Sequence, residues 1–436
     1  MHEDIRTHEA DVLVIGGGAA GLAAALEARA AGADVLVVAK SRAGRSGNTV
    51  VAGCQFCAVV PYPGSPDSPE QHFQDSLSGG QGVNDEELLR ILTEEGCRRL
   101  LKLEEWGVRL LRSGGELVRR IPNGHSHPRG IITDYAEFPA SIGGLSITLP
   151  LRSAAEAAGV RFLDGVPVVR LLVSEGQARG AMGINSEGGE SVVMGARAVV
   201  MAAGGAGHIF ANTNNTRGIC GDSYALMLEA GAVLRDMEFV QFYPSQMSRP
   251  LKVAVASPMF ADGAVLRNRH GERFMPLYDP ERADLATRDV MSRAMFSEVQ
   301  KGNGVEGELY MDCTAVPEGV LQAKYGTLVR DLRKQGIDPA QDWLRIGCTT
   351  HFFMGGAAVD GRSATTVPGL FAAGEAIGGV HGANRLAGNA LTEAVALSAL
   401  ARRESRGAHF REDCPESGEV WLGSHRVRLQ GEDLSV

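Results

Sequence analysis

A glycine-rich turn near the start of the chain constrains the fold more than any other feature. It lies between an apolar strand at 11–15 and an alanine-rich helix at 22–31, and a second strand follows at 34–39. The turn has the spacing G-x-G-x-x-G, formed by Gly16, Gly18 and Gly21. Backbone N–H groups and the helix dipole at such a turn suit a pyrophosphate. The sequence therefore predicts the first βαβ unit of a doubly wound, Rossmann-like α/β domain that binds a dinucleotide.

Length and glycine usage agree with a large ligand-binding domain. The chain has 436 residues, which favours two domains, one of them smaller. Its 56 glycines cluster where apolar runs end, as at 204–205, and this is typical of backbone that approaches a ligand. The second strand ends at Lys40 without the acidic residue that usually binds the adenosine ribose, which makes NAD a poor candidate for the permanent ligand.

The charge balance indicates a small-molecule ligand. The net charge is -9 and no run of Lys or Arg offers a surface for nucleic acid or an anionic membrane. No apolar run reaches the roughly 18–20 residues that a membrane span needs. We expect no nucleic-acid partner, no direct membrane span and a cytoplasmic location.

The cysteines predict reduced thiols. There are seven, an odd number, scattered along a long chain. Cys54 and Cys57 form one CxxC, but no second pair at zinc spacing, haem motif or iron–sulfur run accompanies them. We expect no metal, and we favour two buried thiols over a redox pair at this position.

Several further elements follow from apolar periodicity and glycine punctuation. We expect a polar loop at 61–82, an amphipathic helix at 85–106, strands at 166–173, 180–185 and 195–203, a buried strand at 368–373 and a helix at 389–402. Between about 234 and 345 the glycines thin out and charged residues increase, which indicates an inserted second domain. Residues 404–436 read as a short polar tail that packs on the body, binds a partner or stays mobile.

Five sequence blocks carry a family resemblance. They are GLFAAGEAIGGVHGANRLAGNAL at 369–391, HFFMGG at 351–356, GERFM at 271–275, LATRDVMSRAM at 285–295 and MEFVQFYP at 237–244. Their order and wording resemble the flavoprotein subunits of succinate dehydrogenase and fumarate reductase, and L-aspartate oxidase. The resemblance implies an FAD-binding domain at 1–233 and 346–403 with an α+β capping domain at 234–345. It also implies that the family's C-terminal helical domain is absent here.

The resemblance further implies FAD and its contacts. The pyrophosphate would lie on the turn from Gly16 to Gly21, Glu375 would bind ribitol or ribose hydroxyls, and the helix starting at Asn389 would point its dipole at the flavin C2 carbonyl. The full set of expected cofactor residues is Gly16, Gly18, Ala19, Ala20, Gly21, Lys40, Ser46, Asn48, Thr49, Val168, Ala203, Gly204, Asp222, Glu375, Asn389 and Leu391. Membrane-bound relatives tether the flavin through a histidine where this chain has Asn48, so we expect non-covalent FAD.

The same resemblance implies the catalytic residues. Arg288 would exchange a proton with one substrate carbon while hydride passes between flavin N5 and the other. An arginine needs a site that depresses its pKa for that task, and a helix capped by Asp284 would place Arg288 in a first turn, where the dipole disfavours positive charge. His351 and Arg385 would bind one substrate carboxylate.

The other half of the substrate site departs from the family pattern. Tyr243-Pro244-Ser245-Gln246 stands where dicarboxylate enzymes have His-Pro-Thr-Gly, and Ala256-Ser257 where they have Thr-Glu. The arginine that relays protons is replaced by Phe260, with Asp262 as the nearest acid. A substrate with a carbonyl or apolar group facing Tyr243 and Phe260 is expected, and fumarate should be a poor substrate.

Three functions follow from these observations. The leading one is hydride transfer to or from a C–C bond of a small carboxylate or carbonyl substrate, with electrons from an iron–sulfur or other electron-transfer partner, a diffusible donor or oxygen. The second is oxidation of an amino acid resembling aspartate. The third is an electron-transfer flavoprotein subunit whose substrate site is degenerate.

Overall fold

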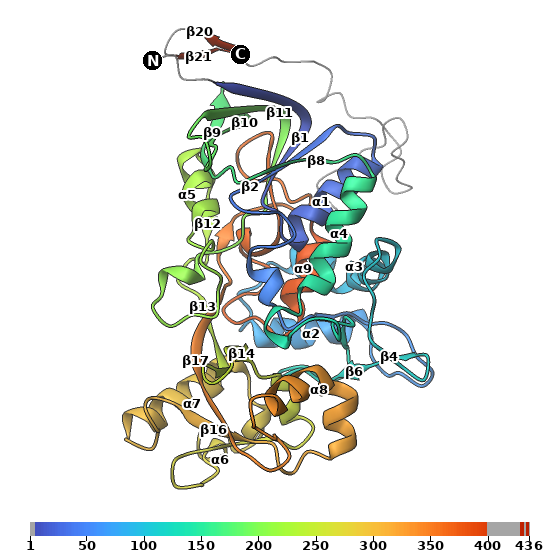
Figure 1. Ribbon diagram of the computed structural model, residues 1–436, viewed down its shortest axis with the longest axis vertical. Helices are drawn as coiled ribbons and strands as arrows, with labels where there is room; N and C mark the ends of the chain where they lie inside the picture. Colours follow the sequence, from blue (N-terminus) through green and yellow to red (C-terminus); the bar gives the residue numbers. More distant parts are fainter. Residues whose placement is uncertain (1–4, 399–427, 431–432, 436) are drawn as a thin grey trace.

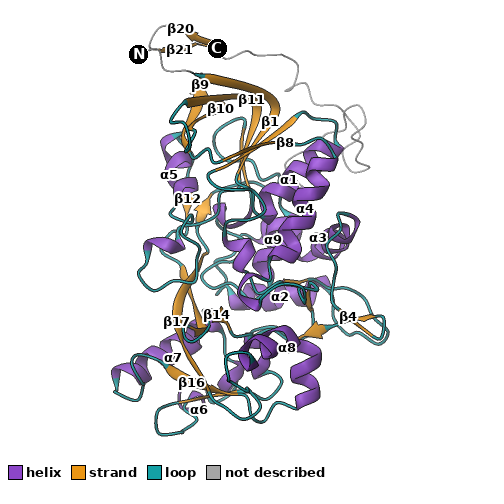
Figure 2. Cartoon of the chain, in the orientation of Figure 1, coloured by secondary structure: helices purple, strands orange, loops and turns teal. Residues whose placement is uncertain are grey.

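The computed structural model describes residues 5–398, 428–430 and 433–435. The chain forms two lobes that follow one another along the longest axis of the molecule (Figure 1). One lobe is built around a large sheet with helices beside it, and the other combines a smaller sheet with helices α6, α7 and α8 (Figure 2).

The helices are α1 (Ala19–Ala30), α2 (Pro69–Gly79), α3 (Glu86–Glu105), α4 (Leu145–Ala157), α5 (Asp222–Glu229), α6 (Met275–Tyr278), α7 (Arg288–Gln300), α8 (Glu318–Arg333) and α9 (Asn389–Ala396). The first strands are β1 (Arg6–Ile15), β2 (Val35–Ala39), β3 (Gln55–Cys57), β4 (Arg112–Ser113), β5 (Glu116–Leu117), β6 (Arg119–Arg120), β7 (Gly130–Ile132), β8 (Arg161–Asp164), β9 (Val168–Ser174), β10 (Gln177–Ile184) and β11 (Ser191–Met201). The remaining strands are β12 (Leu234–Arg235), β13 (Val240–Met247), β14 (Val253–Ala254), β15 (Val265–Arg267), β16 (Leu309–Asp312), β17 (Leu344–Phe353), β18 (Gly356–Ala357), β19 (Leu370–Ala372), β20 (Arg428–Gln430) and β21 (Asp433–Ser435).

The large sheet has the strand order β8-β2-β1-β11-β10-β9, and β19 also pairs with β11. The pairs among β8, β2, β1, β11 and β19 are parallel, whereas β10 runs antiparallel to both of its neighbours. Leu13 and Ile15 of β1 pack in the core on one face of the sheet, and Val14 packs in the core on the other. A strand that is buried on both faces is apolar throughout, which is why this strand was visible in the sequence. The doubly wound α/β class is confirmed.

Both α3 and α2 carry a start signal, but only α3 was predicted. The predicted helix at 85–106 is α3, and Asp85 caps it by accepting a hydrogen bond from the Leu88 amide at 3.3 Å. The predicted polar loop at 61–82 is wrong, because α2 occupies much of it. Ser68 caps α2, and Pro69 follows in its first turn, so the local start signal was present although the segment is polar.

The second lobe has its own core. Its five-stranded sheet has the order β14-β13-β17-β16-β15. Met259, Leu266, Phe274 and Met311 belong to a hydrophobic cluster that is separate from the two cores of the large sheet. Such a separate core supports a second domain that begins at about 234, which we retain as a proposal. Its expected end at about 345 falls inside β17, which belongs to this sheet and runs to Phe353.

The end of the chain is only partly described. Helix α9 ends at Ala396, and the predicted helical residues beyond 398 lie outside the described residues, as does most of the predicted tail at 404–436. Strands β20 and β21 pair antiparallel. Within the described part of the chain, no helix is long and apolar enough to cross a membrane.

Candidate functional site

A cavity of about 760 Å³ is lined by residues from both lobes. From the large-sheet lobe it receives the turn at 16–20, the segments 38–41 and 45–55, and residues next to β11 and α9. From the second lobe it receives Ser257, Arg288 and Tyr325. The expected cofactor and catalytic residues therefore meet in one space, with the exceptions described below.

The glycine turn fits a pyrophosphate sterically. A Cβ added to Gly16, which has φ +116°, would lie 2.2 Å from the Ala202 carbonyl oxygen, so only glycine brings the turn this close to β11. At Gly18, which lines the cavity, an added Cβ would meet only Thr49 Oγ1, at 3.2 Å. Gly21 does not line the cavity: its missing Cβ would fall 2.0 Å from the Gly16 carbonyl oxygen, so it lets α1 pack against the turn.

Other expected cofactor residues line the cavity from several elements. They are Ala19, Ala20, Lys40, Ser46, Val168, Ala203, Gly204 and Asp222. Lys40 and Asp222 form an ion pair, and each side chain is partly exposed. A partly exposed pair of this kind stabilises the fold little, but it fixes where both side chains lie at the cavity wall.

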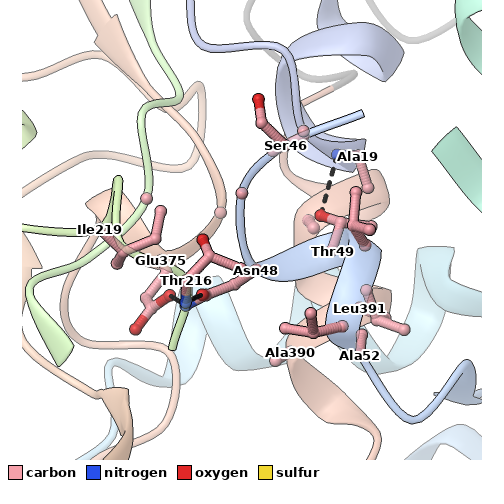
Figure 3. Close-up of a pocket in the computed structure, with 18 of the residues that line it drawn as sticks. Ala19, Ser46, Asn48, Thr49, Ala52, Thr216, Ile219, Glu375, Ala390 and Leu391 are labelled. Atoms are coloured by element: carbon pink, nitrogen blue, oxygen red, sulfur yellow. Dashed lines mark hydrogen bonds between the residues drawn. The ribbon is translucent and has the colours of Figure 1, made fainter. Parts of the chain in front are cut away.

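Asn48 is held by hydrogen bonds in the middle of the cavity wall (Figure 3). Its side-chain oxygen accepts from the Thr216 amide at 3.1 Å, and its nitrogen donates to Asn215 and, at 3.4 Å, to Glu375. Thr49 Oγ1 accepts from the Ala19 amide at 3.2 Å, which ties this segment to the start of α1 (Figure 3). Glu375 accepts from the Phe353 amide at 3.1 Å, yet burial raises its pKa to about 7.

The start of α9 faces the cavity through its backbone rather than through Asn389. Gly388, Ala390 and Leu391 line the cavity, whereas Asn389 does not. Its side chain points to α2, where its oxygen accepts from His72 Nε2 at 2.9 Å and its nitrogen donates to Ser76 at 3.0 Å. The positive end of the helix dipole is thus available to a ligand, and Asn389 anchors it from behind.

Arg288 is the first residue of α7 and lies at the cavity wall. Asp284 does not cap this helix, contrary to our expectation, because its carboxylate accepts from the Leu266 amide and from Arg273, both at 2.7 Å. Arg288 is nevertheless in a first turn, and its guanidinium lies 4.7 Å from the centre of the Tyr243 ring. Burial lowers the pKa of Arg288.

Arg385 and His351 lie beside Arg288 at the same wall. Burial and the charge of Arg288 lower the pKa of Arg385 to about 9. Burial and both guanidinium charges hold the pKa of His351 well below its usual range, so its imidazole is neutral. Its Nδ1 lies 3.1 Å from the Asn214 side-chain oxygen, which makes Nδ1 the donor and leaves Nε2 as an acceptor.

Two residues that sequence reasoning missed organise these three. Gln241 Oε1 accepts from Arg288 and from Arg385, each at 3.0 Å, and its Nε2 donates to the Arg385 carbonyl at 2.7 Å. Asn214 orients His351. Gln241 lies in the MEFVQFYP block, so the block was visible, but its function as a bridge depends on a contact 144 residues away in the chain.

Tyr243 and Ser245 stand where dicarboxylate enzymes bind the second carboxylate, but here their hydroxyls bind the protein backbone. The hydroxyls of Tyr243 and Ser245 both donate to the Val255 carbonyl, at 2.7 and 2.8 Å. The Tyr243 ring packs against His351, with ring centres 5.0 Å apart. Tyr243 therefore contributes its ring rather than a free hydroxyl.

One expectation about this wall needs correction, and the nearest acid is bound to other residues. Phe260 does not line the cavity, because its side chain packs in the core of the second lobe. Asp262 is bound to Lys324 and to the Tyr325 hydroxyl, both at 2.5 Å, and the described residues show no bond between it and Arg288. Ala256 and Ser257 face the cavity instead.

Cys54 and Cys57 are buried free thiols. Burial raises the pKa of each to about 12, so neither is a thiolate at neutral pH. The thiol of Cys57 donates to the Ala387 carbonyl at 3.0 Å. Among the described residues, no cluster of His, Cys, Asp or Glu could hold a metal ion.

The nucleotide turn, the shared cavity and the buried arginines define a dinucleotide-dependent enzyme. The sequence model of the FAD binding domain matches residues 11–391, so the chain belongs to this family and is an FAD-dependent oxidoreductase of the fumarate reductase and succinate dehydrogenase flavoprotein type. A second model, the fumarate reductase flavoprotein C-terminal region, matches residues 387–433. We expected a short polar tail at 404–436 and no C-terminal domain of the family, but the sequence up to residue 433 corresponds to part of that region, most of which lies outside the described residues.

Individual proteins agree with this assignment. The chain is 38% identical to one of the subunits of the fumarate reductase (CoM/CoB) of Methanothermobacter marburgensis, over 88% of this chain and 70% of the relative. It is 36% identical to L-aspartate oxidase of Streptomyces coelicolor, over 92% and 69%. Among solved structures, an FrdA variant of the E. coli quinol fumarate reductase superposes with a TM-score of 0.82 at 30% identity, covering 91% of this chain and 69% of that one.

Proposed function

We propose that the protein transfers hydride to or from a C–C bond of a small carboxylate or carbonyl substrate. One observation carries this proposal. Arg288 and Arg385 lie buried at a cavity wall, and neither forms an ion pair with a carboxylate of the described residues. Buried guanidinium groups without a counter-charge are costly, and a bound carboxylate relieves that cost.

The cofactor would lie along the wall that carries the glycine turn. The amides at 16–20 would hold the pyrophosphate, Glu375 would bind hydroxyls of the ribitol or ribose, and the start of α9 would face the flavin ring. Bound FAD supplies an acceptor or donor of hydride at one carbon of the substrate. Asn48 offers no nucleophilic nitrogen, so acid or heat should release the FAD intact.

Arg288 would hold the proton that the second carbon gains or loses. Its lowered pKa and its place at the start of α7 both favour proton release. Gln241 fixes the guanidinium through one hydrogen bond and leaves other N–H groups for the substrate. Arg385 would bind the carboxylate that orients the C–C bond. The charge of that carboxylate would favour a protonated His351, whose Nε2 could then donate to it.

Oxidation of an amino acid is the second candidate, and the similarity to L-aspartate oxidases favours it. The electrostatics of the cavity favour the first. Asp222 and Glu375 are the acidic residues among its described lining, and both belong to the wall proposed for the cofactor. An ammonium group beside Arg288 and Arg385 would have no carboxylate to compensate it.

The protein also needs a source of electrons. We propose an iron–sulfur or other electron-transfer partner, or a diffusible donor, and a cytoplasmic location. The degenerate electron-transfer subunit remains the third function, and rapid oxidation by an iron–sulfur partner without turnover of any substrate would favour it.

One experiment separates the three functions. The purified holoenzyme is reduced by light without oxygen and mixed with a panel of enoates, enones and imines. We expect an enoate or an enone of the panel to restore the absorbance of oxidised flavin. Oxidation by imines alone would contradict the proposal in favour of the amino-acid oxidase, and oxidation by no member of the panel would favour the electron-transfer function.

A further inference from the structure

The proposed chemistry leaves part of the cavity lining unused. Gln55 of β3, Arg120 of β6, Tyr135, and Tyr325 and Leu328 of α8 line the same cavity as Arg288 and Arg385. Strands β3, β7 and β6 form one small sheet, and Figure 1 shows β6 next to α8, where the two lobes meet. We call Gln55, Arg120 and Tyr135 the β6 subsite.

Arg120 is a buried cation without a counter-charge. Its side chain belongs to a residue that is 3% exposed, and its guanidinium lies 4.4 Å from the centre of the Tyr325 ring. One terminal nitrogen donates to the Lys324 carbonyl, but Nε has no hydrogen-bond partner. The ion pairs of the described residues do not include Arg120. Burying such a charge costs free energy unless an anionic ligand pairs with it.

The acids that could have neutralised Arg120 are used elsewhere. Asp262, which lies near Tyr325, binds Lys324 and the Tyr325 hydroxyl. Asp331 accepts from the Ala140 amide at 2.7 Å and pairs with Arg330 at 3.0 Å. The charge of Arg120 therefore remains available to an anion in the cavity.

Two neighbours complete an anion site. The Oε1 atom of Gln55 is buried without a hydrogen-bond partner, and rotation of its amide by a half-turn presents the NH₂ group instead. Burial raises the pKa of Tyr135, so its hydroxyl stays protonated and can donate. A guanidinium, an amide and a phenol at one end of a cavity suit a carboxylate.

We propose that the β6 subsite binds a second acidic group, at the end of the substrate remote from Arg385. The inference rests on the proposed function, in which Arg385 and His351 hold the first carboxylate. It names the substrate class as an unsaturated diacid. The subsite supplies, from other elements, the second clamp that Tyr243 and Ser245 cannot form because their hydroxyls are bound to Val255. The spacing of the two acids is therefore set by Arg120 and need not be that of fumarate.

A purely structural function for Arg120 makes a different prediction. Through the Lys324 carbonyl and the Tyr325 ring, Arg120 joins the large-sheet lobe to α8. If this contact were its only function, its loss would weaken monoacids and diacids alike. The ratio of the two affinities therefore separates the two functions.

The test uses the oxidised holoenzyme and saturated probes. Pentanedioate and hexanedioate are compared with pentanoate and hexanoate by the change that each causes in the flavin absorbance. We expect at least one diacid to bind about 10- to 100-fold more tightly than its matched monoacid, the gain of one charge-assisted site. In Arg120→Gln the ratio should fall to about twofold while the monoacid affinity is retained.

Two further variants complete the design. Arg119→Gln is the matched control, because Arg119 is on the same strand but bonds Leu117 and Val60 carbonyls and stacks on Tyr62, and it does not line the cavity. It should leave the ratio unchanged. Gln55→Leu, which keeps the interlobe contact of Arg120, should lower the ratio about 3- to 10-fold and keeps the test available if Arg120→Gln does not fold.

The outcomes are distinguishable. Monoacid binding without any preference for a diacid overturns the β6 subsite and leaves the proposed function intact. An equal loss of both affinities in Arg120→Gln also overturns it, in favour of the interlobe contact. If no acid perturbs the flavin at all, the carboxylate site at Arg385 is wrong, and the proposed function fails together with the inference.

Discussion

The two ends of the cavity differ in how their polar groups are satisfied. At the cofactor end, Lys40 pairs with Asp222 and Asn48 bonds Asn215, so the protein meets most polar needs with its own groups. At the substrate end, Arg120, Arg288 and Arg385 each keep a buried Nε without a partner. The side chains of the first end are held in place by each other before a ligand binds, whereas the second end holds buried cations that lack an anionic partner until a ligand binds. Positively charged side chains without a counter-charge are thus concentrated at one end.

The largest effect should come from removing the proton donor at the substrate end. Arg288→Gln should retain FAD and slow oxidation of the reduced flavin by substrate about 10²- to 10⁴-fold, because a positioned acid is worth that much. Arg293→Gln is the control, since Arg293 is on the same helix and forms an exposed pair with Asp289. Single-turnover absorbance measures both, and a near-normal rate for Arg288→Gln would remove the proton-donor assignment.

The next largest effect should come from removing Gln241, which bridges Arg288 and Arg385. Gln241→Leu removes the acceptor shared by Arg288 and Arg385 and should lower turnover about 10- to 100-fold. Gln241→Glu keeps the shape but adds a carboxylate that competes with the substrate for both guanidinium groups. It should therefore weaken pentanoate binding more than Gln241→Leu does. The reverse order, measured by flavin difference spectra, would contradict the bridging function.

At the cofactor end, sterics should matter more than charge. Gly18→Ala places a methyl group that meets only Thr49 within the protein, so the fold should survive while FAD binds about 10- to 100-fold more weakly. Gly319→Ala is the control, because an added Cβ at that position of α8 meets no atom within 4 Å. Equilibrium dialysis of FAD decides, and unchanged affinity in Gly18→Ala would argue against a pyrophosphate on the turn.

The smallest effect is a pH dependence of binding at the substrate end. Arg385 has a pKa of about 9 without ligand, and a bound carboxylate favours its charged form. Affinity for pentanoate should be constant below about pH 9 and fall about tenfold for each unit above it, because the free protein then loses the proton that the complex keeps. FAD affinity should not follow this curve, and a pentanoate affinity that is flat up to about pH 10 would refute the shifted pKa.

How far the sequence could predict the molecule depends on whether a signal is local. The glycine turn, β1 and α3 are specified by neighbouring residues. The prediction for α3 was within one residue of its bounds, whereas β1 begins at Arg6, five residues before the predicted start. Resemblance brought Arg288, His351 and Arg385 to one wall. It could not show that Phe260 turns into a core or that Asn389 points to α2, because side-chain direction depends on packing from distant elements.

Arg120 and Gln241 are residues whose importance could not be predicted from the sequence. Each is an ordinary polar residue in its own segment. Its importance follows from partners on other elements, as with Arg120 and Tyr325 across the interlobe contact. Neither charge pattern nor spacing along the chain reports that a buried cation has been left without an acid.

The path of the chain between the lobes also bears on how such enzymes diversify. The segment that forms the second lobe leaves at Leu234 and returns at Ala357, and these two residues are paired across β12 and β18. An insertion whose ends are adjacent costs the host fold little when its length or content changes. We therefore expect that evolution, or a protein engineer, can exchange this module for one that recognises another molecule while the large-sheet lobe keeps the same redox machinery.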